Sequence, residues 1–256
     1  MRPLLVLVLF GGVAHAAEDA DLIARTRIRQ GWYVGPSVVR GGLSFRAPTA
    51  AIDTRLDAVP ALALGVDYWP DPALGLHLAL HAGLGAEVGV PDSAAKIGYN
   101  LHQIEAGGRY RWHLGPRADA LSLQVGVALR GTIQTAQVQR PSFIVDRTAL
   151  GPEGQIALVW PVVGWRCWVT LQAQAGLPFF VREGPTDSGD PQGFVTYGGQ
   201  AAVVLGVTPS WAVQVQADYR ALDLDFEGEG TRTGGVTDAR VDDHFLTADL
   251  LLRRVF

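Results

Sequence analysis

The stretch Leu74–Val90, LGLHLALHAGLGAEVGV, decides the fold of this chain. Every even-numbered position in it is apolar and every odd-numbered position is polar or very small, so the pattern has a period of two throughout. Successive side chains of a β-strand point to opposite faces, so this stretch is predicted to be one strand with an entirely apolar face. Strands of soluble proteins usually have about 5 or 6 residues, whereas a strand that crosses a bilayer at a tilt needs roughly 9 to 11. The length therefore favours a strand that spans a membrane.

The N-terminal residues indicate export. Residues 1–16, MRPLLVLVLFGGVAHA, combine one positive charge at Arg2 with an apolar run and small residues at the end. This pattern is typical of a secretory signal peptide, and its apolar run is too short to cross a membrane as an anchor. We expect residues 1–16 to be removed, residues 17–30 to form a periplasmic lead-in, and residues 31–256 to form the folded domain.

Composition excludes several classes of protein. The whole chain has 21 basic and 25 acidic residues, a net charge of -4, and removal of Arg2 leaves 20 against 25, or -5. A mildly acidic chain gives no reason to expect nucleic acid as a partner. No later segment approaches 18 consecutive apolar residues, so a membrane-spanning part would have to be a closed β-barrel. The single cysteine, Cys167, cannot form an internal disulfide, and its apolar surroundings suggest a packing role.

The alternation recurs in the segments that follow. Between Gln103 and Leu114, one face is apolar, while the opposite face carries Glu105, Arg109 and Arg111. A soluble β-sandwich would have to bury that charged face in its core, which makes it a poor alternative.

The first strand and the loops are predicted from weaker patterns. In Gly31–Arg46 we expect an outward apolar face and an inward polar face. The outward set is Tyr33, Val39, Leu43 and Phe45, and the inward set is Arg40, Ser44 and Arg46. Near Ala221 and Leu222 the alternation changes, which suggests either a β-bulge or the point where the strand leaves the membrane. The expected long loops are residues 47–56, 91–98, 137–147, 183–193 and 227–243.

Tight turns recur at a nearly constant interval. They centre near residues 71, 117, 162 and 209, at spacings of 46, 45 and 47 residues, with two long strands in each period. A β-propeller blade of similar length would need four short strands, so the repeat favours five hairpins instead. We therefore predict an all-β fold, a transmembrane antiparallel up-and-down β-barrel of ten strands with both termini on the periplasmic side.

The tryptophans lie near the short turns, with one at the start of the first strand. An amphipathic indole ring prefers the interface between lipid and water, so these residues are predicted to form a periplasmic aromatic girdle. The predicted girdle is Trp32, Trp69, Trp112, Trp160, Trp165, Trp168 and Trp211.

These features resemble the small outer-membrane β-barrel superfamily of Gram-negative bacteria, the OmpA/OmpX-like and related barrels. The resemblance covers residues 31–256 and rests on the signal peptide, the GWYVG opening at Gly31–Gly35, the alternation and the terminal Phe256. It implies a place in the outer membrane, in contact with lipid and lipopolysaccharide. It also implies that the last strand, ending at Phe256, is recognised by the barrel-assembly machinery. Arg254 departs from that signal, because an apolar residue is expected there.

A polar interior is expected, and its side chains should pair. If the hairpin around residues 115–120 pairs positions that sum to 235, Glu105 faces Arg130 and Arg111 faces Gln124. Likewise Asp67 would face His77 or Gly75, and Gln200 would face Asp218. Charges must pair where water is scarce, which favours a rigid plug over the alternative of a narrow solute pore. The predicted lumen network is Asp67, His77, Glu105, Arg109, Arg111, Arg130, Glu153, Asp218 and Arg220.

An enzyme, either an omptin-like protease or a lipid-modifying enzyme, is a further alternative. Omptin-like proteases are similar in strand count and use acidic residues and a histidine at the outer rim, where this chain has Asp242, Asp243 and His244. These three are adjacent in one strand rather than facing across a cleft, so we expect no catalytic site. His77 and His81 lie about 13 Å apart on a strand, too far to share a metal, and no cofactor is expected. A structural or surface-interaction role is the leading expectation.

Overall fold

The structure is a computed structural model in which eleven strands are the regular elements of the described residues. It describes residues 30–48, 50–89, 96–115, 120–137, 144–163, 166–232 and 238–256. The strands are β1 (Gly31–Ala47), β2 (Ala50–Tyr68), β3 (Leu74–Gly89), β4 (Lys96–His113), β5 (Ser122–Gln137), β6 (Asp146–Val163), β7 (Cys167–Gly176), β8 (Phe180–Gly184), β9 (Asp190–Thr208), β10 (Trp211–Glu227) and β11 (Ala239–Val255). Within the described part, no helix is long and apolar enough to cross a membrane. The predicted signal peptide and most of the lead-in lie outside the described residues.

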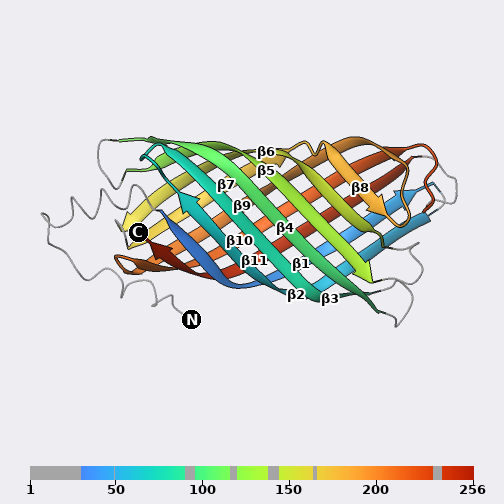
Figure 1. Ribbon diagram of the computed structural model, residues 1–256, viewed down its shortest axis with the longest axis horizontal. Coiled ribbons are helices and arrows are strands. Elements are labelled where there is room, and N and C mark those ends of the chain that lie inside the picture. The colour runs from blue at the N-terminus through green and yellow to red at the C-terminus, as the bar shows by residue number, and fades with distance from the viewer. Residues whose placement is uncertain are drawn as a thin grey trace, which may run out of the picture.

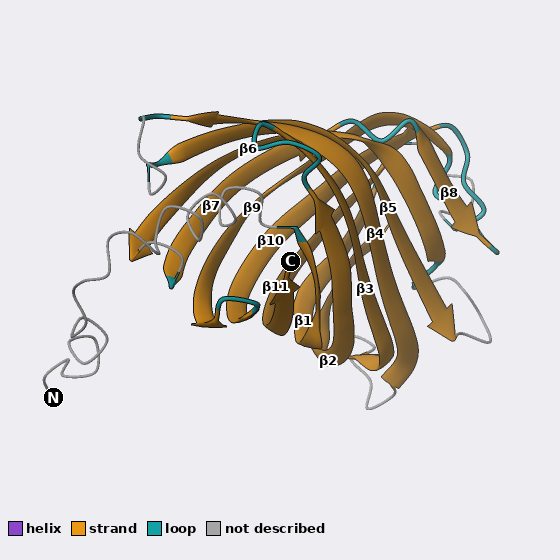
Figure 2. Cartoon of the chain, turned by 60° about the vertical axis from the view of Figure 1, so that its left-hand side comes forward, coloured by secondary structure: helices purple, strands orange, loops and turns teal. Residues whose placement is uncertain are grey.

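The strands close into an antiparallel barrel with ten positions in its wall. Strands that follow one another along the chain pair, except that β7 pairs with β9 and β8 pairs with β6 alone. β1 pairs with β11, and the pairing of β5 with β6 completes the ring. β7 and β8 pair with successive parts of β6 and share one position, so eleven strands make a ten-position wall (Figures 1 and 2). The prediction of an all-β, antiparallel up-and-down barrel with ten strand positions is confirmed.

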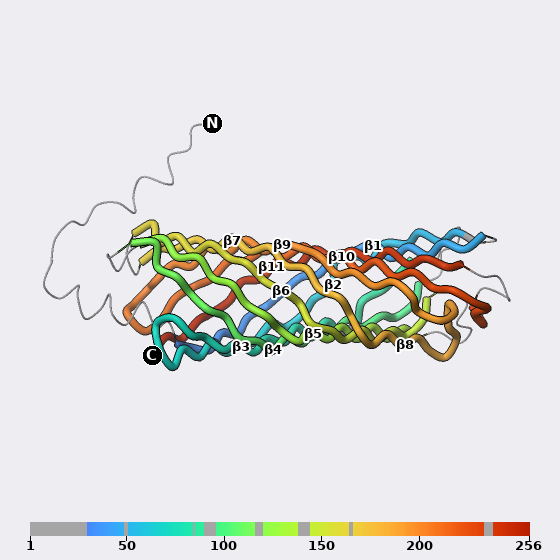
Figure 3. The backbone as a smooth tube through the Cα atoms, turned by 90° about the horizontal axis from the view of Figure 1, so that it is seen from above, coloured from blue at the N-terminus to red at the C-terminus, as the bar shows by residue number. Residues whose placement is uncertain are grey.

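The connections β2–β3, β4–β5, β6–β7 and β9–β10 lie at one end of the barrel, and the connections β1–β2, β3–β4, β5–β6 and β10–β11 lie at the other (Figures 1 and 3). We call these the turn end and the loop end. Gln30 and Phe256 lie together at the turn end, where the Phe256 backbone N–H donates to the Gln30 carbonyl at 3.1 Å. One turn is fixed by Asp71, whose carboxylate accepts from the backbone N–H groups of Ala73 and Leu74.

The strands are longer than the sequence pattern predicts. β1 and β2 continue through the predicted loop at residues 47–56, and β11 begins at Ala239 within the predicted loop at 227–243. The last two residues of β8 and the start of β9 fall within the predicted loop at 183–193. The loop predictions were wrong at these points, because apolar side chains beyond the membrane belt keep the chain in strands.

An exposed apolar belt surrounds the barrel. Leu76, Leu78 and Ile104 are 49%, 47% and 46% exposed, and outward Leu, Val, Ile and Tyr side chains continue around the wall. A contiguous apolar surface of this extent is unfavourable in water and favourable against lipid. Along β3 the belt runs from Leu74 to Ala82, with Leu84 next in sequence, close to the span that a tilted strand needs.

Above the belt, the inward face of a strand becomes apolar and the outward face becomes polar. On β10 the inward side chains change from Asp218 and Arg220 to Leu222 and Leu224, while Asp223 appears on the outward face. The pairing with β11 continues without a shift through this point, so the change marks emergence from the membrane rather than a bulge. Outside the bilayer, water wets the outer wall and the apolar side chains turn inward.

On β3 the exchange does use a bulge. The pairing with β4 shifts between Gly83 and Ala86, and Gly85 adopts a φ of 72°, in the left-handed region that favours glycine. Beyond the bulge Ala86 and Val88 are 4% and 0% exposed, and Glu87 faces outward. The prediction of one continuous apolar face over Leu74–Val90 was therefore wrong beyond residue 84.

The predicted orientation of β1 was also wrong. Val39 and Phe45 are each 3% exposed and point into the barrel, whereas Arg40 and Arg46 are exposed on its outer wall. Tyr33 also faces inward, where it lines the lumen. Most of the upper half of β1 lies above the belt, where the apolar face belongs inside.

The inward apolar side chains fill the loop end in two clusters, which we together call the apolar plug. The first cluster is Val39, Leu56, Val59, Ala86, Val88, Ile97, Tyr99, Leu101, Ile144 and Phe245. The second is Phe45, Ala149, Leu222, Leu224, Phe226, Ala239 and Val241.

Leu224→Ala should test the exchange of faces. Leu224 is fully buried in the plug, so the truncation is expected to lower the free energy of unfolding by about 2–5 kcal/mol. Asp225→Ala, on the exposed face next to it, should change it by less than about 0.5 kcal/mol. Denaturant unfolding of the detergent-folded protein measures both. Equal effects of the two substitutions would contradict an inward Leu224.

Candidate functional site

A polar cavity occupies the middle of the lumen. Its volume is about 120 Å³, so it can hold several water molecules. The polar side chains that line it include Asp67, His77, His81, Gln103, Glu105, Arg109, Arg130, Gln155, Gln172, Gln200, Gln216, Asp218, Arg220 and Arg253. They come from strands all around the barrel, so the alternation of each strand brings them together.

The predicted strand registers are confirmed. Glu105 is the cross-strand partner of Arg130 and Arg111 that of Gln124. The register also pairs Asp67 with His77 and Asp218 with Gln200. The length of each hairpin turn fixes the register, so these pairs could be found from sequence.

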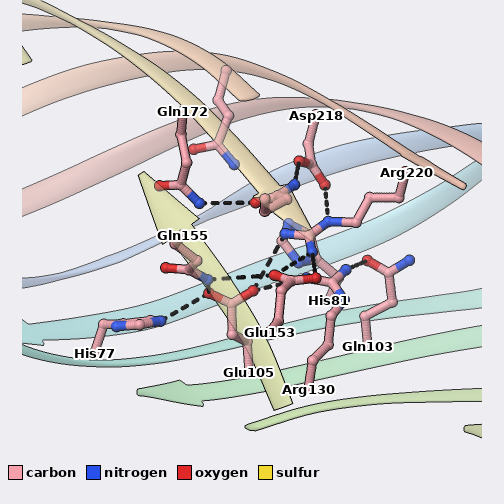
Figure 4. A network of polar contacts seen from close by, with 12 residues as sticks. His77, His81, Gln103, Glu105, Arg130, Glu153, Gln155, Gln172, Asp218 and Arg220 are labelled. Atoms are coloured by element: carbon pink, nitrogen blue, oxygen red, sulfur yellow. Dashed lines mark hydrogen bonds and ion pairs between the residues drawn. The ribbon is translucent and has the colours of Figure 1, made fainter. Parts of the chain in front are cut away.

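Arg220 is the centre of the main ion network (Figure 4). Its guanidinium contacts Glu153 at 2.6 Å and Asp218 at 2.8 Å, and it reaches Glu105 at 3.3 Å. Glu105 in turn accepts from Arg130 at 2.7 Å and lies 2.8 Å from His77 Nε2. Cross-strand register alone could not show that Arg220 spans the lumen to β4 and β6.

Asp67 organises a second network nearer the turn end. Its two carboxylate oxygens accept from Arg109 and Arg253, each at 2.7 Å. Arg111 lies over the Trp69 ring, 3.5 Å from its centroid, in a cation–π contact. The structure thus places all nine predicted network residues on the inward face, in these two groups.

Sequence reasoning missed two charged members of the lumen on β11. Arg253 binds Asp67, and Asp249 contacts His81 at 3.2 Å and Gln216 at 3.1 Å. Both lie on the face opposite the apolar row of the last strand, a signal that alternation does contain. With them the described lumen carries five arginines and five acids, which balance in charge. The arginines are Arg109, Arg111, Arg130, Arg220 and Arg253, and the acids are Asp67, Glu105, Glu153, Asp218 and Asp249.

The turn end of the lumen is closed by aromatic and apolar side chains. Trp168 is 6% exposed and packs inward with Val159, Val204 and Ala212, and Trp69 is 3% exposed. Neither indole can belong to an outward girdle, so that prediction was wrong for both. Both indole rings lie inside the lumen near the turns.

Other predicted girdle residues do face outward. Trp112 and Trp160 are 46% and 58% exposed. Trp32 and Trp211 meet edge to face at 5.7 Å, and Arg254 lies over the Trp211 ring at 4.9 Å. Trp165 lies outside the described residues.

Buried polar contacts hold the loop end together around the plug. Arg147 binds Asp243 and also Glu183, the latter at 2.8 Å. Arg232 lies over the Phe45 ring, 3.8 Å from its centroid. Burial lowers the pKa of Arg232 to about 10, so its guanidinium stays charged at neutral pH.

The rim residues considered for catalysis point in opposite directions. Asp242 and His244 face outward on β11, whereas Asp243 is 2% exposed and binds Arg147 inside the barrel. The structure does not bring them into one cleft. Across the ranges that the structure describes, no three His, Cys, Asp or Glu side chains are grouped so as to hold a metal ion.

Comparisons with known proteins agree on the fold. No family model and no curated protein matches the chain. Among solved structures, the outer membrane protease OmpT of Escherichia coli is similar at a TM-score of 0.50 and 10% identity, over 89% of this chain and 97% of that chain.

Two other solved barrels match less closely in geometry. An outer membrane channel from Pseudomonas putida F1 matches at a TM-score of 0.43 and 14% identity, over 90% of this chain and 96% of that one. OprG of Pseudomonas aeruginosa matches at 0.37 and 10%, over 88% and 96%. At these identities the likeness shows the fold alone, a closed antiparallel β-barrel.

Glu153→Gln should be strongly destabilising. Glu153 is 1% exposed and binds Arg220, so the substitution leaves a buried guanidinium without its main partner. Breaking a buried pair from one side costs about 3–5 kcal/mol of unfolding free energy. Asp53→Asn removes the exposed pair with Arg46 and serves as the control, with no measurable change expected. Denaturant unfolding of both variants is the measurement, and a loss no larger for Glu153→Gln than for Asp53→Asn would contradict a fixed network.

Proposed function

We propose that this protein is an axially closed outer-membrane barrel, a rigid anchor that presents its loop end at the cell surface. The observation that carries the proposal is that packed side chains occupy both ends of the lumen. Among the described residues, the apolar plug occupies the loop end, the Trp69 and Trp168 side chains lie near the turn end, and paired charges line the central cavity between them.

The charge arrangement supports a plug rather than a pore. A conducting wall needs charges that ions can meet in turn, and their binding must be weak enough to release the ion. Here Arg220, Glu153 and Asp67 are each held by ion pairs of 2.6 to 2.8 Å inside the lumen. Ions passing through would have to compete with these internal partners.

The orientation in the membrane follows from the two ends of the barrel. We place the turn end, with Phe256 exposed on the outer wall, in the periplasm, where the barrel-assembly machinery would recognise the last strand. The loop end then faces outward, and the belt meets lipid and lipopolysaccharide. The charged outer wall above the belt, with pairs such as Arg46–Asp53 and Lys96–Glu87, would meet polar headgroups and water.

A narrow pore is the second candidate. The polar central cavity is the observation that favours it, because the lumen is blocked at its two ends by side chains, which can move. Ion conductance distinguishes the closed barrel from the conducting one.

The purified protein in a planar bilayer should show no stepwise conductance, because both ends of the lumen are filled. Arg130→Ala and Glu105→Ala should also be silent, since the closures lie elsewhere. Heat-modifiable migration on a gel verifies that each variant is folded. Steady current steps in the wild type that change in size with Arg130→Ala would reject the closed barrel in favour of the pore.

A further inference from the structure

The barrel wall has a seam at its loop end, between β8 and β9. β7 pairs with β9 as far as Gly176 and Thr196, and beyond this point β8 pairs with β6 alone. Residues 166–232 are all described, and in this segment no ladder joins β8 to β9. Figure 1 shows β8 as a short separate arrow near the loop end.

Two prolines lie at the seam. Pro178 interrupts the strand between β7 and β8, and Pro191 lies on the facing part of β9. Because the N–H groups of Leu177 and Phe179 point to β6, the missing N–H group of Pro178 removes a donor on the side that faces β9. The sequence therefore favours an interrupted wall at this position.

Pro178 turns into the barrel, and a glycine makes room for it. A Cβ atom at Gly151 on β6 would lie 2.3 Å from the Pro178 Cα, so only glycine permits this approach. The flanking backbone stays attached to β6, through Leu177 N–H to Pro152 O at 3.1 Å and Phe179 N–H to Leu150 O at 3.0 Å. The seam is therefore open on its β9 side only.

A small cavity lies directly behind the seam. It has a volume of about 30 Å³ and is lined by seam residues, among them Pro178 and Thr196, and by lumen residues, among them Arg130 and Arg220. Arg130 and Arg220 also line the central cavity. The seam thus adjoins the polar lumen from the side, between the closures at the two ends.

The outer lip of the seam is apolar and lies at the upper edge of the belt. Leu177, Phe179 and Phe180 are 64%, 67% and 43% exposed, and Arg182 follows on the outward face. At this level headgroup water can satisfy the unpaired backbone groups, while the aromatic rings lie against lipid.

From this placement we propose that the seam is a lateral opening, through which small apolar molecules dissolved in the outer leaflet reach the cavity behind Pro178. Elsewhere in the wall, lateral access would break a ladder of backbone hydrogen bonds. At the seam, the β9 side has no backbone hydrogen bonds to break, and a displacement of Pro178 widens the cavity behind it. This inference goes beyond the closed anchor and is compatible with it, because a side opening provides no path along the axis.

Thiol labelling in lipid vesicles tests the opening. In a Cys167→Ser background, Thr196→Cys places a thiol at the seam and Thr170→Cys places a matched thiol in the central lumen. The probes are N-phenylmaleimide, which partitions into the bilayer, and a sulfonated maleimide, which does not. N-phenylmaleimide should label the seam thiol about tenfold faster than the lumen thiol, and the sulfonated reagent, which reaches the seam only from the headgroup water, should label it more slowly than N-phenylmaleimide does.

A proline replacement supplies the decisive control. Pro178→Val combined with Pro191→Val restores the missing N–H groups, so the ladder can close and labelling at position 196 should slow about tenfold. Pro60→Val, on β2 away from the seam, should leave the rate unchanged.

Three results would overturn the proposal. They are equal labelling rates at the two thiols, labelling at position 196 as fast by the sulfonated reagent as by N-phenylmaleimide, and no effect of the double proline replacement. Heat-modifiable migration verifies folding in every variant. Because conductance plays no part in this assay, its failure is distinguishable from failure of the closed-barrel proposal.

Discussion

The structure depends on one constraint, that a strand has two faces and the medium outside the barrel changes along its length. Within the belt the outer medium is lipid, so apolar side chains such as Leu78 and Val215 face outward and polar ones face in. Above the belt the outer medium is water, and the faces must exchange. The polar lumen and the apolar plug are two results of the same rule, applied on either side of the membrane boundary.

This constraint explains both what could be predicted and what could not. The alternation and the evenly spaced turns were sufficient for the fold, the strand count and the pairing of Glu105 with Arg130. The exchange of faces on β1 was not predicted, because apolar residues such as Val39 and Phe45 occur both in a buried plug and on a lipid-facing belt. On β3 the alternation of apolar and polar residues continues unchanged in the sequence. The bulge at Gly85 reverses which of them face into the barrel.

The site was predictable in membership and not in its geometry. Alternation identifies which side chains enter the lumen, since it depends only on position along one strand. Contacts across the lumen depend on barrel closure and tilt, so the meeting of Arg220 with Glu153 or Arg253 with Asp67 needs three-dimensional structure. The same limit applied to Trp69 and Trp168, because proximity to a turn does not tell whether an indole points to lipid or into the lumen.

The part of the barrel above the belt changes how the loop end can meet another molecule. On β2 the outward polar residues begin near Asp57 and include Arg55 and Asp53. The strand continues to Ala51, and at about 3.3 Å per residue this part carries the wall some 15 Å beyond the lipid tails once the tilt is included. A molecule arriving there meets hydrogen-bonded sheet with a packed interior. Such a surface loses little conformational freedom on contact, so recognition would depend on shape and charge already in place.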